Sequence, residues 1–184
     1  MDQALFMWLS VVIISAVGTL AHFLYNMAHR NKIIGLFTAV NESTWEHIKI
    51  ALTPAFLWGL VDGALYGANP NYFLAKIASL LVITFTIPVI FYAYRYFAKK
   101  SILPIDISIF YIAIILGQLA FFAIINFPAQ GQIVNYFATI AMFIFFGIYM
   151  TSTLFPQHTF IFKDPVTGKY GFPTRTHQNP KKSK

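Results

Sequence analysis

The side chains of this chain that are best suited to chemistry lie in the stretch NESTWEHIK, residues 41–49. It contains Glu42, Glu46 and His47, and a further histidine, His22, lies upstream in an apolar segment. Carboxylates and imidazoles that converge can bind a divalent metal ion such as Zn²⁺, relay protons, or act as general acids and bases. These four side chains are therefore the candidate catalytic residues and the candidate metal ligands.

The spacing of these residues leaves a structural interpretation open. Two adjacent positions E-H with a distant second histidine do not match the H-E-x-x-H pattern of metalloproteases, so the metal hypothesis depends on residue type alone. Ser43 and Glu46 have the S-x-x-E spacing of a helix capping box, and Lys49 can pair with Glu46 one turn away. Trp45 suits a membrane interface. We expect structural roles for these residues and for Asn41, in a polar cluster that joins two helices.

The composition of the chain indicates a protein of the lipid bilayer. Of its 184 residues, 58% are hydrophobic and 10% are charged, whereas a soluble domain carries about 25% charged residues. The chain contains no cysteine, which excludes disulfides, thiolate catalysis and cysteine-ligated metal sites.

Five stretches are apolar over the roughly 20 residues that a helix needs to cross a membrane. We therefore predict an all-α, multi-pass integral membrane protein of the cell membrane, with one transmembrane domain over residues 1–155. A further apolar segment, residues 33–40, is too short to cross and is either interfacial or re-entrant. The predicted spans are approximately 4–27, 44–66, 72–97, 105–126 and 132–154.

The basic residues predict the orientation of these spans. With five spans, twelve of the 13 lysines and arginines fall on one side, and only Lys76 falls on the other. The positive-inside rule then places the N-terminus outside and the C-terminus in the cytoplasm. The net charge of +7 is thereby explained as a topology signal, so we expect no binding of nucleic acid.

The same topology brings the candidate site residues together. His22 lies about five residues before the end of the first span, or about 7 Å inside it at 1.5 Å per residue. His47 lies at a similar depth in the second span, which a short connection makes a neighbour of the first. His22, Glu42, Glu46 and His47 can therefore converge at the cytoplasmic side. Ionisable groups at membrane depth are costly, which makes them functional candidates.

Two charged residues near the outer side also face each other in this arrangement. Asp62 lies about four residues before the end of the second span, and Lys76 lies about four residues into the third. We predict an ion pair between them, and the alternative is that Asp62 lines an ion or proton path.

A basic tail, residues 156–184, follows the last span. Within it the segments TFIFKD and KYGF flank PVTG, with Asp164 before a proline and Gly168 after the turn. This pattern predicts a turn between two short extended segments, a hairpin-like tail that packs on the cytoplasmic helix ends.

The block N-E-S-T-W-E-H-x-K, an upstream H-F-x-Y at residues 22–25 and D-P-x-T-G-x-Y-G at residues 164–171 resemble a family of small, uncharacterised multi-pass membrane proteins of bacteria and archaea. The resemblance covers most of the chain and implies no known activity. The positions that form these motifs are His22, Asn41, Glu42, Ser43, Trp45, Glu46, His47, Lys49, Asp164, Gly168 and Gly171.

Three functions are consistent with these features. The first is binding of a small solute or ion by the His/Glu cluster that faces the cytoplasm. The second is a membrane-embedded enzyme, with or without a divalent metal, that acts on a lipid or isoprenoid head group. The third is an accessory or assembly subunit of a membrane complex. A homo-oligomer is also considered, because a transporter with only five spans and no inverted repeat would need more than one copy.

Overall fold

The five predicted spans all form helices. The computed structural model of the chain describes residues 2–173, and five helices within them are long and apolar enough to cross a membrane. Each end lies within two residues of its predicted position. The helices of the described chain are α1 (Gln3–Met27), α2 (Lys32–Phe37), α3 (Thr44–Tyr66), α4 (Tyr72–Ala98), α5 (Leu103–Ile125) and α6 (Gln132–Ser152).

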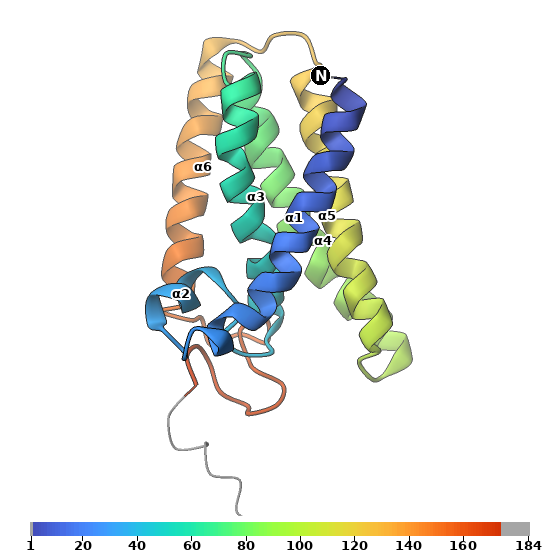
Figure 1. The fold of residues 1–184 in the computed structure, drawn as a ribbon, viewed down its shortest axis with the longest axis vertical. Coiled ribbons are helices and arrows are strands. Elements are labelled where there is room, and N and C mark those ends of the chain that lie inside the picture. The colour runs from blue at the N-terminus through green and yellow to red at the C-terminus, as the bar shows by residue number, and fades with distance from the viewer. Residues whose placement is uncertain (1, 174–184) are drawn as a thin grey trace, which may run out of the picture.

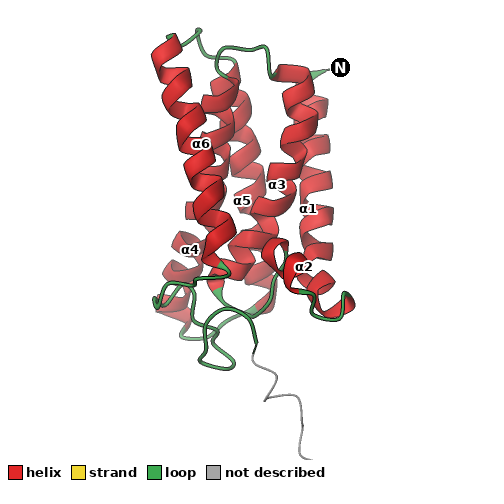
Figure 2. Cartoon of the chain, turned by 90° about the vertical axis from the view of Figure 1, so that its left-hand side faces the viewer, coloured by secondary structure: helices red, strands yellow, loops and turns green. Residues whose placement is uncertain are grey.

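The five long helices stand side by side in one bundle (Figures 1 and 2). Helix α1 packs against α3 and α5, and α4 packs against α3, α5 and α6. Helix α6 contacts the rest of the bundle on one side only, where Phe56 of α3 meets Phe146 and Tyr149. Its remaining surface is exposed and apolar, as expected of a helix surrounded by lipid.

The short apolar segment at residues 33–40 overlaps the six-residue helix α2, Lys32–Phe37. It lies at the end of the bundle opposite the N-terminus (Figure 1), together with residues 38–43 and the tail residues 153–173. We call this the motif end, because two sequence motifs lie there, the motif block of residues 41–49 and the tail motif of residues 164–171.

Small residues let the helices approach closely beside this end. A Cβ atom on Gly18 of α1 would lie 2.5 Å from the carbonyl oxygen of Ile50 and 2.7 Å from the Phe110 ring. Only glycine is compatible with this contact, which holds α1 against α3 and α5. Below it, the lower ends of α4 and α5 turn away from α1 (Figure 1).

The outer charged pair expected from the sequence is present. Lys76 Nζ lies 2.7 Å from Asp62 Oδ2, and both side chains are buried between α3 and α4. The Tyr72 hydroxyl donates a hydrogen bond of 2.7 Å to Asp62 Oδ1. Space for these side chains comes from Gly59 and Gly63, where a Cβ would approach Lys76 and Tyr72. A buried carboxylate is thus satisfied by two donors.

We expect Lys76→Met to lower the free energy of unfolding by about 3 kcal/mol, because it leaves the Asp62 carboxylate buried without a cation. The double variant Asp62→Leu/Lys76→Met should recover to within about 1 kcal/mol of the wild type, because no charge then remains buried. Unfolding in mixed micelles, followed by circular dichroism, measures both values. Lys99→Met, at an exposed lysine, is the control, and an equal loss in all three variants would contradict the role of the pair.

Candidate functional site

The motif block contains a buried ion pair at the start of α3. Lys49 Nζ lies 2.7 Å from Glu46 Oε2, and both side chains are almost completely buried. The ammonium also donates hydrogen bonds of 2.8 Å to the Gly35 carbonyl oxygen of α2 and to the Thr153 hydroxyl after α6. A lysine ammonium has three hydrogens, so each one has a partner.

The helix cap differs from the predicted capping box in one half. The Ser43 hydroxyl accepts a hydrogen bond from the Glu46 amide, as expected of the N-cap. However, the Glu46 carboxylate accepts from the Val40 amide at 3.0 Å, and the Ser43 amide donates instead to Asn41 Oδ1. The reciprocal half of the box is absent because Glu46 turns inward, toward Lys49.

The tail motif folds into the turn that its sequence predicts. An antiparallel bridge joins Lys163 and Tyr170, and the Asp164 carboxylate accepts hydrogen bonds from the Val166 amide and the Thr167 hydroxyl. Gly168 has a φ of 71°, which glycine adopts without strain. The predicted turn in this part of the tail is therefore present, while residues 174–184 lie outside the described residues.

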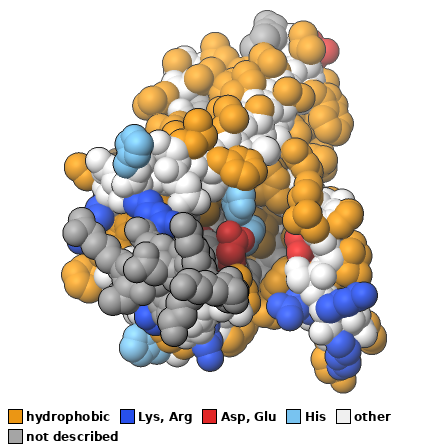
Figure 3. Space-filling view, turned by 60° about the horizontal axis from the view of Figure 1, so that its bottom comes forward, with side chains coloured by type: hydrophobic (Ala, Val, Ile, Leu, Met, Phe, Trp, Pro, Cys, Tyr) orange, Lys and Arg blue, Asp and Glu red, His pale blue; other side chains and the backbone are white. Residues whose placement is uncertain are grey.

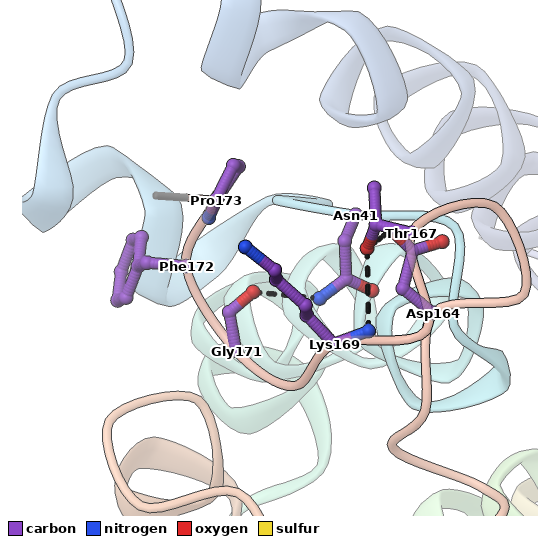
Figure 4. A pocket seen from close by; sticks show the side chains of 7 residues that line it. All are labelled: Asn41, Asp164, Thr167, Lys169, Gly171, Phe172 and Pro173. Carbon is purple, nitrogen blue, oxygen red and sulfur yellow. Dashed lines mark hydrogen bonds between the residues drawn. The ribbon is translucent and has the colours of Figure 1, made fainter. Parts of the chain in front are cut away.

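This turn docks on the motif block (Figure 4). Asn41 Nδ2 donates a hydrogen bond of 2.8 Å to the Gly171 carbonyl oxygen. The Trp45 backbone amide donates a hydrogen bond to the Ile161 carbonyl oxygen, and the Trp45 ring stacks on the Phe162 ring with 4.8 Å between their centroids. The cavity beside Asn41 is about 40 Å³, room for a few water molecules at most. The contact between the two motifs is therefore an interface within the chain.

His22 and His47 lie together on the other side of the block. Their ring centroids are 5.6 Å apart, and His47 Nε2 lies 3.8 Å from Glu42 Oε2. His47 Nδ1 lies 2.9 Å from the Ser43 carbonyl oxygen, which can only accept, so Nδ1 carries a hydrogen. His22 Nδ1 is buried and has no hydrogen-bond partner among the described residues.

The two histidines line a groove between α1, α3 and α5. Its volume is about 350 Å³. Figure 3 shows the motif end from below, where histidine and carboxylate side chains lie at a hollow between two parts of the surface. Apart from the histidines, the walls are mostly apolar. The other lining residues are Thr19, Phe23, Ile50, Leu103, Asp106, Ile107, Phe110 and Tyr111.

Asp106 also belongs to the site, although its place in the groove could not be predicted from the sequence. It lies in the first turn of α5, and its side chain lines the groove. Its carboxylate accepts hydrogen bonds from the hydroxyls of Tyr94 and Ser101. An ionisable residue at the entrance of a span was the available signal; that α5 faces the two histidines could not be inferred from it.

The four candidate residues thus divide into two groups. His22 and His47 line the groove and Glu42 lies beside His47, whereas Glu46 is bound to Lys49 inside the bundle. Within residues 2–173, no group of three or more histidine, aspartate or glutamate side chains is placed to hold a metal ion. The geometry offers the metal hypothesis no support.

Comparison with known proteins places the chain in a family without assigning an activity. A model described as "Family of unknown function (DUF6512)" matches residues 1–172, which include both motifs and all six helices. The chain belongs to this family. No curated protein and no solved structure matches it. The family is uncharacterised, as expected. Its prokaryotic origin and its two characteristic motifs stay predictions. The function of this DUF6512 member must therefore be inferred from the groove.

The two glutamates of the block allow a matched test of this division. We expect Glu46→Gln to lower the free energy of unfolding by about 3 kcal/mol, because Lys49 then stays buried without a counter-charge. Glu42→Gln should change it by less than about 0.5 kcal/mol, because that side chain is exposed. Unfolding in mixed micelles measures both variants. Equal losses in the free energy of unfolding would show that Glu42 also stabilises the fold.

Proposed function

We propose that this protein binds an amphiphilic molecule in the groove between α1, α3 and α5, with its polar head at His22 and His47. The observation that carries the proposal is the combination of apolar walls and paired imidazoles in one groove of about 350 Å³. Ligand sites have volumes of about 300–1,000 Å³, mostly apolar walls and a few polar groups that fix orientation. This groove has each of these properties.

The depth of the groove supports a ligand from the membrane. His22 lies five residues before the end of α1, so the head group would lie about 7 Å inside the helix end. Thr19 and Phe110 lie next to the close contact at Gly18 and line the deeper part. An apolar chain would lie along these walls while the head group stays near the aqueous boundary.

A second candidate function, acid–base catalysis on the head group of the same ligand, is favoured by the His47 ring. Its Nδ1 is held by the Ser43 carbonyl oxygen, which leaves Nε2 to exchange a proton beside Glu42. A histidine oriented through one nitrogen by a hydrogen bond is the arrangement that general bases use. Glu46 is not available for this role, because its carboxylate is bound to Lys49 and Val40.

We infer, in addition, that the motif end faces the cytoplasm of the cell and that the N-terminus lies outside. The inference is supported by the excess of lysine and arginine in the loops and tail at that end. The groove then opens toward the cytoplasmic side of the cell membrane, and the ion pair of Asp62 and Lys76 lies in the outer half.

Photolabelling tests the binding function. A dodecanol that carries a diazirine in mid-chain is added to the protein in phosphatidylcholine vesicles, and labelled residues are identified by mass spectrometry after irradiation. We expect saturable labelling of Phe23, Ile107 and Phe110, which an excess of plain dodecanol removes. Phe143 on the exposed face of α6 should be labelled without saturation, because that face meets bulk lipid.

Two neighbouring substitutions give the matched control for this experiment. Thr19→Trp fills the groove, and its native hydroxyl bonds only to the Ser15 carbonyl oxygen of its own helix. Leu20→Trp adds the same ring one residue on, where the side chain is 68% exposed. We expect the first variant to lose the saturable labelling and the second to keep it. Saturable labelling that survives in Thr19→Trp would place the ligand elsewhere.

Cysteine labelling tests the orientation, and because the chain contains no cysteine, only an introduced cysteine can react. The two test variants are Ala129→Cys, in the loop before α6, and Thr159→Cys, in the tail. Residues 129 and 159 are both exposed. In intact cells, we expect a membrane-impermeant maleimide to label residue 129 and to leave residue 159 unlabelled until the membrane is opened. The reverse pattern would invert the topology.

A further inference from the structure

The hydrogen-bonding groups at the head-group end of the groove are mainly acceptors. Since Nδ1 of His47 donates to the Ser43 carbonyl oxygen, the neutral ring presents the lone pair of Nε2 toward Glu42. The facing helix α5 contributes a third acceptor, Asp106, whose carboxylate lines the groove and keeps free lone pairs beside the hydrogen bonds that it accepts from Tyr94 and Ser101. Acceptors that face one another across a partly apolar space are satisfied by a ligand that donates hydrogen bonds.

The charge of the groove points the same way. Its lining contains no lysine or arginine. Within residues 2–173, Glu42 makes its only ion pair with His47, and Asp106 makes none. Of the three basic residues that most closely precede Asp106 in the sequence, Arg95 and Lys99 lie over the rings of Phe91 and Tyr96. The third, Lys100, makes no ion pair with the described residues. The groove therefore presents negative charge that no lysine or arginine of the described chain neutralises through an ion pair.

A cation would be stabilised here and an anion would be repelled. Asp106 lines the mostly apolar groove and the exposed Glu42 lies beside it, so both carboxylates attract a positive charge, Asp106 more strongly than it would in water. The aromatic rings in the lining, Phe23, Phe110 and Tyr111, offer faces that attract ammonium groups as well. A phosphate would meet Glu42 and Asp106 with only the two histidines to balance its charge.

We propose that the amphiphile bound in this groove has a protonated primary amine as its head group. The ammonium donates its hydrogens to His47 Nε2, Glu42 and Asp106, and its alkyl chain lies along the apolar walls. This inference rests on the proposed function of the groove and adds the chemical class of the ligand. It distinguishes long-chain amines from alcohols and phosphates with the same chain.

Competition against the photoreactive dodecanol tests the head group directly. Dodecylamine, dodecanol and dodecyl phosphate compete for labelling of Phe23, Ile107 and Phe110 in phosphatidylcholine vesicles, with each competitor adjusted to the same concentration in the membrane. We expect dodecylamine to compete at a concentration lower by about tenfold or more than dodecyl phosphate, with dodecanol between them.

Removing the charge of the carboxylates should weaken the preference for dodecylamine over dodecyl phosphate. Glu42→Gln and Asp106→Asn keep the size of each side chain and take away its charge, and we expect either variant to reduce the preference for amine over phosphate by about threefold or more. Glu42 is exposed, so its variant is expected to fold even if Asp106→Asn does not. Asp2→Asn, at the opposite end of α1, is the control for a change in net charge and should leave the preference unchanged.

The outcomes separate this inference from the function on which it depends. If the three competitors act equally in the wild type, or if phosphate competes best, the amine is excluded while the groove remains a binding site. An order that both Glu42→Gln and Asp2→Asn leave unchanged also overturns the inference, because the preference then comes from the vesicle. If no saturable labelling occurs in the groove, the proposed function and this inference are both wrong.

Discussion

The interior of this bundle is organised by the need to satisfy a buried ammonium. Lys49 is fully enclosed, and its three hydrogens are bound by Glu46 on its own helix, Gly35 on α2 and Thr153 after α6. An unpaired charge in such surroundings costs several kcal/mol, so the three segments cannot separate without a large penalty. Glu46 extends the network to the Val40 amide. A single side chain thereby fixes the short helix, the block and the start of the tail relative to one another.

The groove follows from this fixed end. On one side, α1 and α3 are held together by the close contact at Gly18, and on the other side α4 and α5 are held by Gly117, where a Cβ would lie 2.6 Å from Ile83. Between these two pairs the bundle opens toward the motif end, and His22 and His47 lie at the opening. The polar residues of the block therefore divide by direction: Lys49 and Glu46 point inward and stabilise the fold, while His47 and Glu42 point outward and remain accessible to a ligand.

Much of the fold could be predicted because lipid imposes strong rules. A spanning segment must be helical, apolar and about 20 residues long, so hydropathy located all five helices to within two residues. Pairing rules for buried charge likewise led from Asp62 and Lys76 to their ion pair. The site was predictable only in part. Depth along neighbouring helices brought His22 and His47 together correctly, but depth does not determine which way a side chain turns, and Glu46 turned inward.

The sequence by itself determined the number and length of the five long helices, the turn at Asp164 and Gly168, and the residues able to do chemistry. Each of these depends on local hydropathy or on the conformational preferences of single residues. Only the tertiary structure decided that the tail docks on Asn41 and Trp45, that Asp106 shares a groove with His22 and His47, and that Glu46 lies outside it. These facts depend on contacts between segments far apart in the chain, because helix packing sets which faces meet, and no local pattern encodes that choice.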